Sequence, residues 1–165
     1  MTLDVAIHRA SPLWKETPGL DRLIERAVLA AAAGAGVALQ EGAEVSVQLA
    51  DDRLIRALNA QWRGIDEPTN VLSFPAASAA ALAAAPLLGD IVLGYETVRR
   101  EAGELGFAFE DCVAHLVVHG FLHLIGFDHQ TPAEADRMEK LETDILGEIG
   151  VADPYAATVA ADETA

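Results

Sequence analysis

The chain is poor in cysteine, in aromatic residues and in positive charge. Of its 165 residues one is cysteine and 5% are aromatic, and 11 lysines and arginines stand against 26 aspartates and glutamates. Cys112 alone cannot form an internal disulfide, which excludes the disulfide-rich secreted classes. The formal net charge of −15 excludes a protein that coats nucleic acid tightly, because such binding depends on lysine and arginine displacing counterions from phosphates.

Long hydrophobic runs are also missing. The stretch AVLAAAAGAGVAL is too short and too rich in alanine for a bilayer span, which takes about 20 apolar residues. The start MTLDVAIHR has neither the basic region nor the apolar region of a secretion signal. We therefore expect a cytoplasmic protein that has no membrane partner.

The composition that remains, 52% hydrophobic and 22% charged, is typical of a globular domain with a real core. We expect one domain over residues 1–150 and a flexible C-terminal tail over residues 151–165. Alternating apolar residues predict strands in LDVAIHR and EVSVQLA, and short apolar runs predict two more at residues 71–74 and in GDIVLG. Between them, the alanine-rich segment 76–86 is either a surface excursion or a short helix.

Helical spacing of apolar residues predicts five helices, at residues 20–35, 52–63, 95–105, 110–125 and 131–148. The order of strands and helices predicts an α+β fold with a single mixed sheet of about four strands packed with about five helices. Segment 53–63 carries three arginines and no acid, so a local cationic site is expected despite the overall negative charge.

Three histidines lie in the apolar stretch HGFLHLIGFDH. On a helix, His119 and His123 project from one face one turn apart. Gly126 can end that helix in the left-handed conformation, and the reversed chain can then bring back His129. Three imidazoles with the fourth position left to solvent are typical of a catalytic zinc site, so we expect one Zn²⁺ per chain at the end of a central buried helix.

Three other interpretations of these histidines stay open. Each histidine can be a separate hydrogen-bonded core residue. The spacing is also that of the metzincin proteases, H-E-x-x-H-x-x-G-x-x-H, although Gly120 stands where their catalytic glutamate would be. Finally, a zinc ion can be purely structural in a noncatalytic interaction module, although structural zinc normally has four protein ligands.

Neighbouring residues are candidates for supporting roles. His115 lies one helical turn before His119 and either helps the site, by orienting it or meeting substrate, or fills space in the helix packing. Asp128 either holds a ligating imidazole in its required tautomer or caps the turn.

The histidine block, together with WRGIDEPTNVLSFP and LLGDIVLGYETV, closely resembles the YbeY family of bacterial single-strand endoribonucleases involved in ribosomal RNA maturation. The blocks follow the family's order from about Val45 to Tyr155. Trp62 and the alanine-rich segment depart from the family pattern. The resemblance implies an α+β metalloprotein with zinc on His119, His123 and His129, and an essential arginine at Arg63.

The resemblance further implies processing of the 3′ end of small-subunit rRNA and a role in ribosome quality control. Its partners would be single-stranded RNA, the small-subunit rRNA precursor, and ribosomal proteins or assembly factors, whose basic surfaces can compensate for the negative charge of this chain. The expected chemistry is metal-assisted phosphodiester hydrolysis, with Arg63 neutralising charge on the phosphate. Asn70 and Ser73 either hydrogen-bond the RNA or fix their loop against the sheet.

Overall fold

Four strands form one mixed sheet in the computed structural model, which describes residues 2–15 and 17–155. The order across the sheet is β1-β2-β4-β3. β1, β2 and β4 run parallel, and β3 is antiparallel to β4. The strands comprise β1 (Asp4–Arg9), β2 (Glu44–Ala50), β3 (Val71–Pro75) and β4 (Leu87–Gly94).

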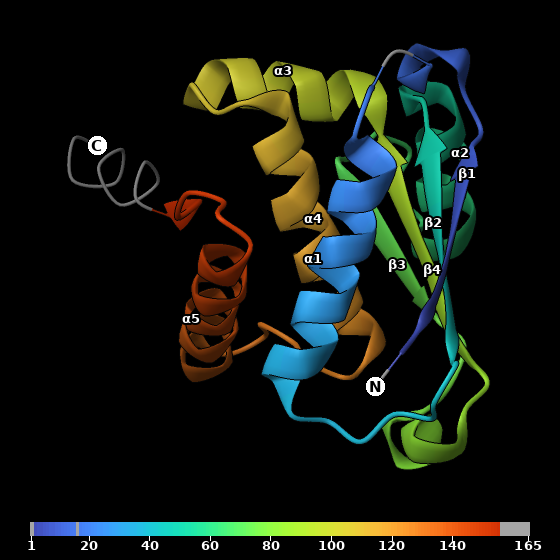
Figure 1. The fold of residues 1–165 in the computed structure, drawn as a ribbon. Helices are drawn as coiled ribbons and strands as arrows, with labels where there is room; N and C mark the ends of the chain where they lie inside the picture. Colours follow the sequence, from blue (N-terminus) through green and yellow to red (C-terminus); the bar gives the residue numbers. More distant parts are fainter. Residues whose placement is uncertain (1, 16, 156–165) are drawn as a thin grey trace.

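Helices cover both faces of this sheet (Figure 1). α1 and α4 lie side by side on one face with α5 packed outside them, and α2 covers the opposite face. The α-helices are α1 (Leu20–Ala35), α2 (Asp52–Arg63), α3 (Tyr95–Leu105), α4 (Phe109–Leu124) and α5 (Pro132–Glu148). The predicted α+β fold with one mixed sheet is therefore confirmed, and the alanine-rich segment contains a short 3-10 helix, Ala79–Ala84.

The main core lies between the sheet and the layer formed by α1 and α4. The alternating residues Val45, Val47 and Leu49 of β2 are all fully buried in it. α4 is apolar on nearly every side, which is why it is sandwiched between the sheet, α1 and α5 rather than lying at the surface. This packing holds the end of α4 against the core, while His119 and His123 on it stay partly exposed.

α4 approaches the sheet closely at Gly120. A Cβ atom there would lie 3.0 Å from both Ile91 Cγ2 and Ser73 Oγ, and 3.4 Å from Val71 Cγ2. The Ser73 hydroxyl also donates a hydrogen bond of 2.9 Å to the Gly120 carbonyl. Ser73 thus fixes β3 against α4, and the missing side chain at Gly120 sets the distance between them.

The residues that follow α5 are packed rather than loose as far as the structure describes them. Val151 and Pro154 are buried, and the Tyr155 hydroxyl donates a hydrogen bond to Glu142. These contacts hold residues 151–155, and residues 156–165 lie outside the described residues. The division into a domain and a flexible tail stays a prediction.

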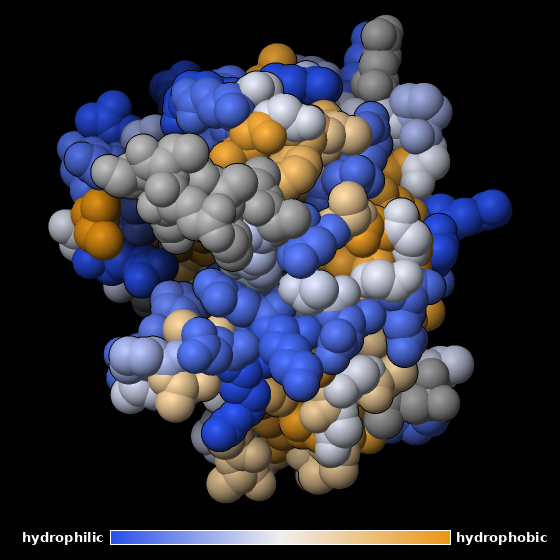
Figure 2. Space-filling model, turned by 90° about the vertical axis from the view of Figure 1, so that its left-hand side faces the viewer, coloured by the Kyte–Doolittle hydropathy of each residue, from blue (hydrophilic) through white to orange (hydrophobic). Residues whose placement is uncertain are grey.

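Hydrophilic side chains predominate on the face shown in Figure 2, with smaller hydrophobic patches between them. Within the described part of the chain, no single helix is long and apolar enough to cross a membrane.

Candidate metal centre

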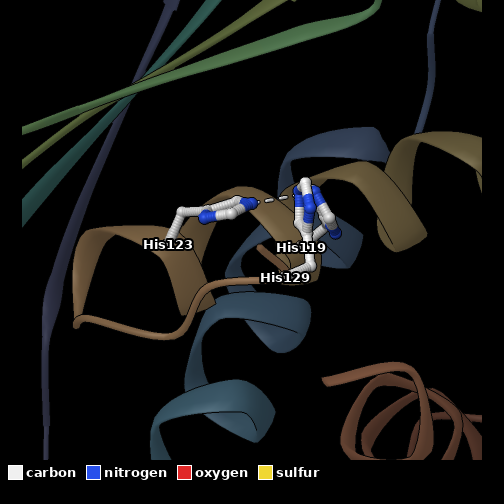
Figure 3. Close-up of side chains that lie close together, drawn as sticks. All are labelled: His119, His123 and His129. Carbon is white, nitrogen blue, oxygen red and sulfur yellow. Dashed lines mark hydrogen bonds between the residues drawn. The ribbon is translucent and has the colours of Figure 1, made fainter. Parts of the chain in front are cut away.

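Three histidine side chains converge where α4 ends (Figure 3). His119 and His123 come from the last two turns of α4, and His129 comes from the loop that follows. One ring nitrogen from each lies within 4.8 Å of the other two, and the Nε2 atoms of His119 and His123 are 3.1 Å apart. Gly126, with φ 102°, lets the chain turn back after the helix, as its position in the sequence predicted.

A buried carboxylate from α5 forms a hydrogen bond with one histidine of this cluster. Glu142 is fully buried. Its Oε1 accepts a hydrogen bond of 2.6 Å from His119 Nδ1, and its Oε2 accepts one of 3.0 Å from His115 Nε2. The Tyr155 hydroxyl donates a further hydrogen bond to Oε2. Both carboxylate oxygens therefore have partners, as a buried charge requires.

The pKa of Glu142 reflects two opposing effects. Burial raises it, but hydrogen bonds from His115 and His119 and the charges of these rings lower it more, to about 2. Glu142 is therefore ionised at neutral pH and can only accept hydrogen bonds. Nδ1 of His119 therefore donates to Glu142, while Nε2 of the same ring faces His123 Nε2 at 3.1 Å.

The three rings fit a metal ion by their chemistry. Burial, and to a smaller extent the neighbouring His119 and His129, lower the pKa of His123, so its ring is neutral at neutral pH, as a metal ligand must be. Three imidazole nitrogens suit zinc and other transition metals. A second group of ligand atoms, from His115, His119 and Glu142, also lies within 4.8 Å, but in it Glu142 already bonds both imidazoles.

The protease interpretation has no support from this geometry. Gly120 faces β3 and β4, where a side chain would meet Ile91 and Ser73. A glutamate at this position would therefore point into the sheet and not toward the histidines.

Of the two roles considered for Asp128, the structure shows the contact within the turn. Its Oδ1 accepts a hydrogen bond of 2.7 Å from the backbone N–H of His129, which stabilises the turn that carries the third histidine. The carboxylate that orients an imidazole is Glu142 instead.

Glu142 was not predicted from the sequence, although its position carries a signal. It lies four residues after Met138 and three before Ile145, both of them buried, so an acid interrupts the apolar stripe of α5. An acid on a buried helix face needs a partner inside the protein, and the histidines supply it.

Two of the other predicted residues meet at a neighbouring hollow. Asn70 and His115 both line it, together with residues of α3, α4 and the C-terminal segment. The Asn70 side-chain N–H donates a hydrogen bond of 2.8 Å to Glu101 Oε1. Ser73 is not among the lining residues.

Arg63 is not bonded to the histidine cluster. It is the last residue of α2, it is exposed, and no hydrogen bond or ion pair joins it to the histidines among the residues that the structure describes. Next to it, Trp62 is 65% exposed and its ring lies 6.4 Å from that of Phe74 in β3. Of the expected cationic group on α2, Arg56 is engaged in an ion pair with Asp66 at 2.9 Å.

Comparison with known proteins gives a consistent set of relatives. A family model described as Endoribonuclease YbeY matches residues 14–150. Proteins named Endoribonuclease YbeY from Bradyrhizobium sp. and Chelativorans sp. are 51% and 53% identical to this chain. The first alignment covers 89% of this chain and 89% of the relative, and the second covers 94% and 93%.

Among solved structures, the solution structure of TM1509 from Thermotoga maritima is similar to this fold. Its TM-score is 0.56 at 28% sequence identity, and the match covers 87% of this chain and 90% of that one.

Proposed function

Because the chain belongs to the YbeY endoribonuclease family, we propose that it is a zinc-dependent endoribonuclease that cuts single-stranded RNA. The observation that carries the zinc dependence is the convergence of His119, His123 and His129 within 4.8 Å. Three protein ligands leave a coordination position open, which favours a catalytic over a structural ion.

Each residue of the candidate site has a distinct role in this proposal. His119, His123 and His129 would hold the ion, and Glu142 fixes the proton of His119 on Nδ1. When bound, zinc lowers the pKa of a coordinated water and stabilises negative charge on a phosphoryl group. Arg63 is exposed and free to meet a phosphate, whose oxygens its planar guanidinium matches.

The cellular substrate that we propose is the precursor of small-subunit rRNA, cut near its 3′ end, with a further role in ribosome quality control. A net charge of −15 gives the isolated chain little attraction for RNA phosphates. Basic ribosomal proteins or assembly factors would therefore bring enzyme and RNA together in the cytoplasm. Cells that carry only an inactive variant should accumulate rRNA with an unprocessed 3′ end, visible by mapping RNA ends.

A combined metal and cleavage assay tests the proposal. Purified protein should hold about one zinc ion per chain and cut single-stranded RNA but not casein. His123→Ala should lose both zinc and cleavage, because two imidazoles hold the ion too weakly. Arg63→Ala should keep zinc and lose cleavage, while Arg53→Ala, an exposed arginine of the same helix, is the matched control.

Each outcome distinguishes between functions. Cleavage that survives the loss of zinc in His123→Ala would overturn the metal-dependent mechanism. Tight zinc without any RNA cleavage would favour the noncatalytic module, and casein cleavage would restore the protease interpretation.

A further inference from the structure

A hollow with a volume of about 130 Å³ lies beside the histidine cluster. A cavity of about 150 Å³ can hold benzene, so this hollow is close to the size of a small planar ring. Residues of α3, of the first half of α4 and of the C-terminal segment form its walls, together with Asn70. Nothing in the proposed cleavage chemistry uses it.

The hollow is one helical turn away from the candidate metal centre. His115 lines it, and the His115 and His119 ring centroids are 6.2 Å apart. Tyr155 lines both this hollow and the recess that contains His119 and His129. A phosphate at the three histidines would therefore place a neighbouring nucleotide of the same strand within reach of the hollow.

The walls suit a flat apolar ring. Val98, Leu105 and Leu116 supply aliphatic surface, and Phe107 and Tyr155 supply aromatic rings. RNA-binding proteins hold unpaired bases on surfaces of this kind, because every base has a π-face that stacks on an aromatic side chain.

The polar groups of the hollow exclude a phosphate. Glu101 and Asp111 contribute carboxylates, and no lysine or arginine is among the described residues that line it. Burial, followed by the charges of Asp111 and Glu101, raises the pKa of the Cys112 thiol, so this side chain remains neutral. A second phosphate would be repelled here, whereas a neutral base would not.

The same groups are mostly hydrogen-bond acceptors. The Asn70 amide N–H already donates a hydrogen bond to Glu101 Oε1. Asn70 Oδ1 and the other oxygen of Glu101 are left as acceptors. His115 is not free to offer Nε2 to a ligand, because this atom bonds Glu142. Acceptors of this kind recognise the exocyclic amine of a base, as carboxylates do with the N4 amine of cytosine.

We propose that this hollow binds the base of a nucleotide next to the cleaved phosphodiester, and that it selects a base with an exocyclic amine over uracil, which has none. The inference rests on the proposed ribonuclease function, since it assigns a subsite to the substrate of that reaction. Glu101 is the residue that determines the preference.

Cytosine and uracil provide the test because they differ mainly in an amine against a carbonyl at C4. In a short single-stranded RNA whose cleavage site has been mapped, each nucleotide flanking the cut is changed in turn from C to U. At one of the two positions, kcat/KM should fall about tenfold for U, the size expected for a good contact between a carboxylate and a base amine.

Glu101→Gln should reduce this preference, because its amide N–H can donate to the uracil carbonyl. Glu104→Gln is the matched control: Glu104 is an exposed acid of the same helix, 67% exposed in its side chain, and does not line the hollow. Its C-to-U ratio should equal that of the unchanged protein. Equal cleavage of C and U at both positions, or an unchanged ratio in Glu101→Gln, would overturn the inference and leave the nuclease function intact.

A binding measurement tests the hollow even if no RNA is cut. Cytidine and uridine, which carry no phosphate, are titrated separately into the unmodified protein while backbone amide NMR signals are followed. Cytidine should shift the signals of Leu105, Phe107 and Tyr155 at lower concentration than uridine does. Shifts that are the same for both nucleosides, or absent for both, would refute the subsite whatever the cleavage assay shows.

Discussion

At the scale of single residues, the histidine cluster depends on a side chain that does not belong to it. Glu142 bonds His119 at 2.6 Å and fixes which ring nitrogen carries the proton. A carboxylate behind a ligating imidazole also makes that imidazole a stronger ligand. In the proposed zinc site Glu142 would therefore be a positioning residue, which acts on the ion only through His119.

Replacing Glu142 should weaken zinc binding by about 10- to 100-fold. For Glu142→Gln the loss of zinc affinity should be close to 10-fold, because an amide oxygen still accepts the hydrogen bond from His119 Nδ1 but carries no charge. For Glu142→Ala the loss should be close to 100-fold. Competition with a chromophoric chelator measures the zinc dissociation constant, and the visible spectrum of the cobalt-loaded protein reports the ligand field directly.

The control for this prediction is Glu148→Gln, an exposed acid on the same helix. It should leave both the zinc dissociation constant and the cobalt spectrum unchanged. If Glu142→Gln lowers only the unfolding temperature, with affinity and spectrum unaltered, its role is structural and the positioning role is refuted.

Sequence patterns at this scale predicted which residues are close in the chain, and missed partners that are distant. The spacing of four residues brought His119 and His123 together because a helix repeats every 3.6 residues. Glu142 is separated from His119 by 23 residues, and only the packing of α5 on α4 decides that they meet. Asp128, by contrast, bonds the backbone of the next residue, His129, which is a local contact of the kind that the sequence can suggest.

At the scale of elements, the close approach of α4 to β3 and β4 determines where the histidines lie. Gly120 allows this approach, and Ser73 secures it through a hydrogen bond to the Gly120 carbonyl. The sequence showed the apolar surface of α4 but not which strands it would contact, because strand order depends on the packing of the whole sheet.

A pair of glycine substitutions tests this packing. Gly120→Val should destabilise the fold by about 1 to 3 kcal/mol, since the added methyl groups would overlap Ile91 and Ser73. Gly103→Ala, within α3, should instead stabilise it by about 0.5 to 1 kcal/mol, because a Cβ there meets nothing within 4 Å. Denaturant unfolding of both variants measures the two changes. A Gly120→Val protein as stable as the unchanged one would contradict the close packing.

At the scale of the whole molecule, the fold class followed from the order of strands and helices, because both periodicities are strong in this chain. The contacts of residues 151–155 did not. Residues 151–155 have no periodic pattern, yet Val151 and Pro154 are buried and Tyr155 bonds Glu142. Hydrogen bonds join Tyr155 to Glu142, Asp153 to Thr143 and Val151 to Leu146, and no local pattern shows them.

The charge of the whole molecule predicts how the isolated protein binds RNA. With a formal net charge of −15 the isolated protein should bind single-stranded RNA weakly, and its few phosphate contacts should give a shallow dependence of affinity on salt. Fluorescence anisotropy of a labelled RNA between about 50 and 200 mM salt measures both quantities. Adding a basic ribosomal protein should tighten binding, because its positive surface offsets the repulsion. Tight RNA binding by the isolated protein that persists at high salt would show that a local site outweighs the overall charge.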